Sequence, residues 1–151
     1  MAICLGMMTL SMHYCSFFDR LLVRMELDAL YSLYAMLQQR ALLHNREQCL
    51  YFDDKTNSYR YDNVIRTCGR GVCFGVQKGV LGPPSSPAHE IRDAIMFDKH
   101  VCIFYPDGKI QSGSIYLTNA ARDVSYALTC PVAAVSYVRM YAYDQGWLLL
   151  S

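Results

Sequence analysis

The chain has 151 residues, of which 53% are hydrophobic and 18% are charged, and its formal net charge is +1. This length fits one domain, and the high apolar content with little net charge excludes a disordered chain. Fourteen basic against thirteen acidic side chains argue against a protein that mainly binds nucleic acid, since such proteins are usually visibly basic. Because the cysteine count of seven is odd, the cysteines cannot all pair within one chain.

Residues 1–18 contain no charged side chain. As a helix they would span about 27 Å, slightly less than the roughly 30 Å hydrocarbon core of a bilayer. We interpret this segment as the transmembrane half of an N-terminal helix; a buried core helix and a signal-peptide core are the alternatives. A cleavable signal peptide is disfavoured, because no basic residue precedes the segment and no A-x-A-like exit follows it.

Residues 19–45 predict an amphipathic continuation of the same helix, which ends near Asn45. No glycine lies between Gly6 and Gly69 and no proline precedes Pro83, so nothing forces a break. Apolar residues at spacings of three and four predict one buried helical face. These residues are Leu30, Leu33, Leu37 and Ala41, with Tyr34 beside them.

After Asn45 the pattern changes to short β-branched and aromatic runs separated by turn signals, which predicts antiparallel strands. The predicted strands are residues 49–52, 59–61, 64–68, 72–76, 100–105, 114–119, 125–130 and 135–143. Gly69–Gly71 is a candidate three-residue hairpin turn between two of them. One long helix followed by a run of strands predicts an α+β domain, with the head spanning residues 19–151.

Residues 79–90 hold three of the five prolines and therefore cannot form a central strand. Because strand-like sequence continues on both sides, we interpret them as an ordered surface loop that crosses between sheets. In the last predicted strand, side chains alternate between two faces. One face carries Val138, Met140 and Ala142, and the other carries Arg139, Tyr141 and Tyr143.

Cys68 and Cys73 flank the predicted turn at Gly69–Gly71, at a spacing that matches neither a redox C-x-x-C nor a zinc knuckle. If facing strands bring them together, they predict a structural disulfide outside the reducing cytoplasm; two unpaired core cysteines are the alternative. The four histidines are scattered, so no metal site is predicted. The sequence predicts no catalytic residues and no cofactor.

Several strings, taken together, resemble one family. They are ELDALY (26–31), QRA (39–41), GPPSSP (82–87), FYPDG (104–108), SGSIYL (112–117) and VRMY (138–141). The ordered set resembles the minor pseudopilins of bacterial type II secretion, in particular the H class (GspH/FimT-like). The resemblance implies a type IV pilin-like fold, with a long N-terminal helix packed on antiparallel β-sheets.

The resemblance departs from the family at the N-terminus. Family precursors have a short basic leader, a cleavage-point glycine and a Phe-Thr-Leu-x-Glu start, and this sequence has only Gly6 followed by MMTL. Arg20 and Arg24 after the apolar segment would favour a cytoplasmic head, whereas the family head is exported. We therefore expect that the sequence begins inside the family's membrane helix.

The resemblance implies a structural subunit and not an enzyme: a minor component of the pseudopilus that supports export across the outer membrane. It implies a single-pass inner-membrane location with a periplasmic head, and N-methylation after processing. Implied partners are other major and minor pseudopilins, the inner-membrane secretion platform and, only for a longer precursor, the prepilin peptidase. No small-molecule substrate and no nucleic acid are expected.

Two parts of the head are candidate partner-contact sites. They are the loop residues Gly82, Pro83, Pro84, Ser85 and Ser86, and the strand residues Tyr141 and Tyr143. Tyrosine is enriched at interfaces, although an ordinary exposed strand face is the alternative. A FimT-like minor pilin of a type IV pilus is the second functional hypothesis, and a membrane-tethered thiol redox module is the third.

Overall fold

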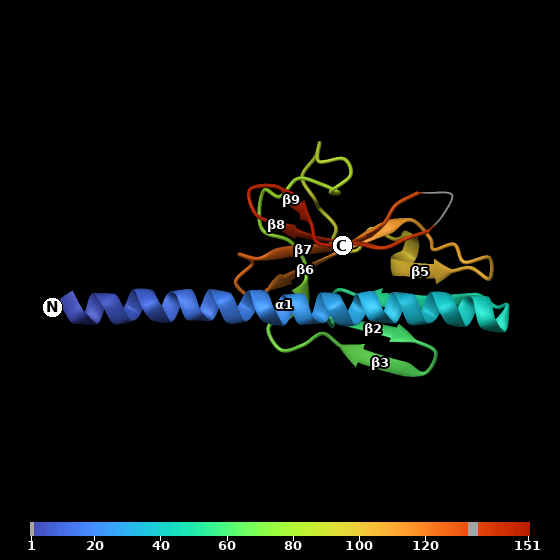
Figure 1. The fold of residues 1–151 in the computed structure, drawn as a ribbon, viewed down its shortest axis with the longest axis horizontal. Helices are drawn as coiled ribbons and strands as arrows, with labels where there is room; N and C mark the ends of the chain where they lie inside the picture. The colour runs from blue at the N-terminus through green and yellow to red at the C-terminus, as the bar shows by residue number, and fades with distance from the viewer. Residues whose placement is uncertain (1, 133–135) are drawn as a thin grey trace.

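Helix α1 (Ala2–His44) forms the long axis of the molecule, and the β-rich head packs along its C-terminal half (Figure 1). The computed structural model describes residues 2–132 and 136–151, with side chains from residue 17 onward. At 1.5 Å per residue, the 43 residues of α1 span about 65 Å. Within the described residues, no helix is long and apolar enough to cross a membrane. The transmembrane assignment of residues 1–18 therefore stays a prediction.

The helix ends where the sequence predicts, at a left-handed cap. Asn45 has a φ of 48°, a conformation that asparagine tolerates better than most residues. The backbone N–H of Arg46 donates to the Ala41 carbonyl at 3.1 Å, and the N–H of Asn45 donates to the Leu42 carbonyl at 3.4 Å. This is the Schellman arrangement, which satisfies the last helical carbonyls and turns the chain into the first strand.

The first sheet has the strand order β3-β2-β1-β5, and all its pairs are antiparallel. Its strands are β1 (Gln48–Asp53), β2 (Ser58–Tyr61), β3 (Val64–Thr67) and β5 (Val101–Phe104), the last preceded by the 3-10 turn η1 (Asp98–His100). The second sheet has the order β4-β6-β7-β8-β9. Its strands are β4 (Val72–Phe74), β6 (Gly113–Asn119), β7 (Ser125–Cys130), β8 (Arg139–Tyr143) and β9 (Trp147–Leu149).

The main core lies where α1 meets the two sheets. The predicted helical face is confirmed: Leu30, Leu33, Leu37 and Ala41 are at most 9% exposed, and Tyr34 is fully buried. The Tyr34 ring meets Phe104 of the first sheet edge-on, with centroids 5.2 Å apart. The α+β fold, with one helix packed on antiparallel sheets, therefore follows the prediction.

The predicted hairpin across Gly69–Gly71 is wrong. β3 pairs with β2 in the first sheet, whereas β4 pairs with β6 in the second, so the three residues connect two sheets. The physical reason is burial: Val72 and Phe74 of β4 are buried, whereas every residue of β3 is exposed. An exposed edge strand offers β4 no apolar surface to cover, and the second sheet does.

The remaining differences concern strand limits. Residues 125–130 form β7 as predicted, whereas the predicted strand at 72–76 ends at Phe74. The sequence interpretation did not include β9, and the predicted last strand began at Val135, which lies outside the described residues.

Candidate functional site

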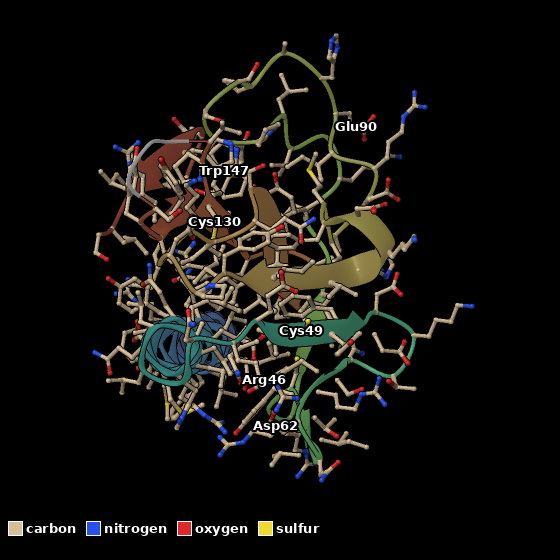
Figure 2. All side chains as sticks on the ribbon, turned by 90° about the vertical axis from the view of Figure 1, so that its right-hand side faces the viewer. Arg46, Cys49, Asp62, Glu90, Cys130 and Trp147 are labelled. Atoms are coloured by element: carbon tan, nitrogen blue, oxygen red, sulfur yellow. The ribbon has the colours of Figure 1, made fainter. Side chains whose placement is uncertain are left out.

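The predicted contact loop is an ordered structure closed by its own backbone. Leu81 and Glu90 form an isolated antiparallel bridge, and the N–H of Gly82 donates to the carbonyl of His89 at 3.0 Å. These bonds join the two ends of the loop and leave its middle residues as an exposed tip (Figure 2, beside the labelled Glu90). The interpretation of this segment as an ordered surface loop is confirmed.

Trp147 fastens this loop to the second sheet. Its indole Nε1–H donates to the Leu81 carbonyl at 2.7 Å. Its ring lies against Tyr143 at a centroid distance of 5.2 Å and against the fully buried Tyr116 at 5.8 Å. Tryptophan suits this position because it supplies a large apolar ring and one hydrogen-bond donor. Sequence reasoning missed Trp147, although it is the chain's one tryptophan.

The loop and strand β8, which carries Tyr141 and Tyr143, contact each other mainly by packing within this chain. Tyr141 and Tyr143 are half-buried and pack against a small apolar cluster with Val80 and Ile91 of the loop segment. A hollow of about 200 Å³ is lined by Tyr141 together with loop residues including Pro83. The tyrosine face is therefore largely covered by this chain's own loop.

Gly82 lies where the loop comes closest to Ile91 and Trp147. A Cβ at this position would lie 2.8 Å from Cδ1 of Ile91 and 3.3 Å from Nε1 of Trp147. The following residues Pro83 and Pro84 are half-buried, whereas Ser85 and Ser86 are exposed. Of the predicted contact residues, the two serines thus remain freely available on the loop tip.

Replacing Trp147 with phenylalanine tests whether the indole holds the loop. Trp147→Phe removes the donor to Leu81 and part of the buried ring, so we expect a loss of about 1–2 kcal/mol of stability. Limited proteolysis should then cut the loop faster than in the parent chain. Tyr51→Phe, which alters an exposed aromatic residue of β1, is the control and should change neither. An unchanged cleavage rate in Trp147→Phe would show that the indole does not restrain the loop.

Polar contacts fix α1 against the head at several levels. The Glu26 carboxylate accepts from the Tyr59 hydroxyl at 3.0 Å and from the backbone N–H of Gly69 at 2.9 Å. Nearer the C-terminus, Gln38 donates to the Gly108 carbonyl at 2.7 Å. Burial, with the nearby Glu26 charge, raises the pKa of Tyr59 well above its ordinary value. The hydroxyl therefore stays protonated as a donor, and the helix holds one orientation.

That orientation leaves a second apolar face of α1 without cover, here called the outer stripe. Its residues recur at spacings of three, four, seven and eleven, which places them on one side of a helix. They are Phe18, Leu22, Met25, Met36 and Leu43, with exposed fractions of 58%, 40%, 59%, 37% and 80%. The centres of the stripe and of the buried face lie more than a quarter turn apart around the helix, since successive residues advance about 100°. Sequence reasoning missed this stripe, although its spacing would have revealed it.

The two cysteines proposed as a disulfide are free thiols in this structure. Cys68 follows β3 and is buried, whereas Cys73 lies on β4 in the other sheet. The hairpin that was to bring them together is absent, and the bond itself stays a prediction. Burial, followed by the Glu26 charge, raises the pKa of Cys68 to about 12, and burial also raises the pKa of Cys73. A nucleophilic redox thiol needs the opposite shift.

In the part of the chain that the structure describes, no three His, Cys, Asp or Glu side chains gather as a metal site. The described residues instead present two surface features. One is the uncovered apolar face of α1, which is held in one orientation, and the other is the loop of the head that Trp147 supports. Together with the antiparallel sheets, the long helix defines a type IV pilin-like α+β fold.

Comparison with known proteins supports this fold. The minor pseudopilin EpsH from the Type 2 Secretion System of Vibrio cholerae has a similar solved structure, with a TM-score of 0.56 and 12% sequence identity. The match covers 80% of this chain and 96% of that one. No family model matches the sequence, and the search of curated proteins finds no match. At this identity the likeness shows a shared fold.

Proposed function

We propose that the chain is a minor structural subunit of a type II secretion pseudopilus, of the H class, which supports protein export across the outer membrane. The pilin-like fold supports this proposal. The observation that carries it is the outer stripe of α1, because an apolar face held away from its own head needs a partner. Exposed apolar surface of this kind marks interaction sites.

The partners that suit the outer stripe are the N-terminal helices of other pilin-like subunits. The stripe is long and narrow. This shape fits a second helix packed alongside α1 and does not fit the surface of a globular domain. The contacts that fix α1 to the head, such as Glu26 to Gly69, keep the stripe facing outward. A neighbouring helix can therefore pack on it without displacing the head.

The same proposal places the chain in the bacterial inner membrane as a single-pass protein with a periplasmic head. Its other partners would be major pseudopilins and the inner-membrane secretion platform, and a longer precursor would be cut by the prepilin peptidase and N-methylated. The exposed loop tip at Ser85 and Ser86 is the head surface that we assign to neighbouring subunits.

Complementation of a gene deletion tests this function. We expect the deletion to reduce the exoproteins in the culture supernatant and the unaltered chain to restore them. Met25→Lys, in the middle of the outer stripe, should restore them poorly, by a factor of roughly ten or more, because burying a lysine in an apolar helix interface costs about 2–3 kcal/mol. Its melting temperature should stay unchanged, since Met25 is 59% exposed.

Ala35→Lys is the matched control, because Ala35 is exposed on the same helix but lies off the stripe. It should restore export fully. Normal export in the deletion strain would contradict the proposal. If pilus-dependent motility failed instead, the chain would be a FimT-like minor pilin of a type IV pilus. Equal export with both lysine variants would show that the outer stripe has no role in assembly.

A further inference from the structure

Two of the four sheet edges are open on their outer side. The first sheet ends at β3 and β5, and the second ends at β4 and β9. The chain covers β5 itself, since the N–H of Gln111 donates to the Ile103 carbonyl at 2.8 Å. At β4, the N–H of Phe74 donates to the Asn57 side chain at 3.1 Å. In the part of the chain that the structure describes, no hydrogen bond reaches the outer backbone groups of β3 or β9.

The backbone of an open edge favours one kind of partner. It presents N–H and C=O groups in alternation, and only another extended chain can satisfy them in a continuous ladder. Natural edge strands are usually protected by lysine, proline or a bulge. The sequence of β9 is Trp-Leu-Leu, without a charge or a proline, and β3 carries one charged residue, Arg66. Both strands are therefore suited to pairing with a further strand.

Both open edges also carry exposed apolar side chains. Val64 and Ile65 on β3 are 42% and 69% exposed, and Leu148 and Leu149 on β9 are 54% and 58% exposed. Because neighbouring residues of a strand point to opposite faces, each edge presents one apolar side chain on either face of its sheet. Strands joined along these edges would form apolar cross-strand pairs on both faces.

Charge and position favour β9 of a second copy as the partner of β3. Arg66 on β3 and Asp144, where the turn into β9 begins, are exposed and form no ion pair among the described residues. Residues 144–151 hold no basic side chain, so they offer Arg66 attraction without repulsion. The two edges lie on opposite sides of α1 (Figure 1), so one chain cannot close this pair on itself.

We propose that β3 of one copy pairs with β9 of a second copy, which joins the first sheet of one head to the second sheet of the next. Since the two surfaces differ, the contact is heterologous, and the copy at each end keeps one open edge for a further copy. This contact goes beyond the role proposed above, and it uses neither the outer stripe nor the loop tip.

The test measures the association of the full-length chain in detergent by sedimentation. Every chain carries Met25→Lys, so that packing along the outer stripe cannot account for the result. We expect the mass of this parent chain to rise with concentration above that of one copy. Ile65→Lys and Leu149→Lys should each weaken the association roughly tenfold or more, because a charge on an apolar edge opposes strand pairing. Both sites are exposed, so the melting temperatures should stay unchanged.

Mixing the two variants identifies the pairing. Ile65→Lys keeps its β9 edge and Leu149→Lys keeps its β3 edge, so an equimolar mixture should form one-to-one dimers that grow no further. Val132→Lys is the matched control, because Val132 is 89% exposed and lies on neither edge; it should associate like the parent chain. Amide hydrogen exchange of residues 62–69 and 144–151 should slow as the parent chain associates. That measurement stands alone if a lysine variant does not fold.

A parent chain that stays monomeric at every concentration would overturn the proposal, and so would a monomeric mixture of the two variants. Association of Leu149→Lys with itself would mean that β3 pairs with β3, and association of Ile65→Lys with itself would mean that β9 pairs with β9. Either result would contradict the heterologous contact. Because export is measured separately, failure here leaves the proposed pseudopilus role intact.

Discussion

Replacing Leu30 with alanine is expected to lower the free energy of unfolding by about 3 kcal/mol. Leu30 is 0% exposed and lies on the helical face that packs against both sheets. The shortened side chain removes buried methyl groups and leaves a cavity that a rigid helix cannot fill by moving. At this chain length the change corresponds to a fall in melting temperature of roughly 6–12 °C, measured by circular dichroism.

Leu22→Ala is the matched control for Leu30→Ala. It makes the same chemical change on the same helix, but Leu22 is 40% exposed and belongs to the outer stripe. Its effect on stability should stay within about 0.5 kcal/mol. Equal losses from the two variants would contradict the orientation of α1 described above, because they would mean that the outer stripe is also packed within the chain.

The second large effect is expected at Gly113, the first residue of β6. An added Cβ would lie 2.5 Å from the Phe97 ring and 2.7 Å from the carbonyl oxygen of Met96. The Met96 backbone cannot withdraw freely, since its N–H donates to the Ser114 carbonyl at 2.8 Å. Gly113→Ala should therefore cost about 3 kcal/mol, near the upper end for overpacking, as measured by urea unfolding.

Gly146→Ala provides the comparison for this variant. A Cβ at Gly146 would meet no atom within 4 Å, and the backbone there does not need a positive φ. We expect its unfolding midpoint to stay close to that of the parent chain. If Gly113→Ala were equally mild, the contact between β6 and the Phe97 segment would be looser than the structure describes.

The helix and its end were predictable because their causes are local. The spacing of Leu30 and Leu37 defines one helical face, and Asn45 provides a residue that tolerates the left-handed cap. Most strands were predictable for the same reason, since alternation within a few residues reflects one buried face. Strand β8 is an example, because Tyr141 and Tyr143 share one of its faces, as the alternation predicts.

The pairing of strands was less predictable, because it depends on residues far apart in the chain. Gly69–Gly71 has the composition of a hairpin turn, yet β4 pairs with β6 because Val72 and Phe74 need a surface to cover. The support of the loop was likewise not predictable, because nothing near it in the sequence signals that Trp147 donates to Leu81 from 66 residues away.

The uninterrupted helix also has a mechanical consequence. No proline precedes Pro83, so α1 offers no built-in hinge between its N-terminal end and the head. The contacts of Glu26 and Gln38 oppose rotation of the head relative to α1. A rotation of α1 about its axis, or a shift along it, therefore carries the head with it.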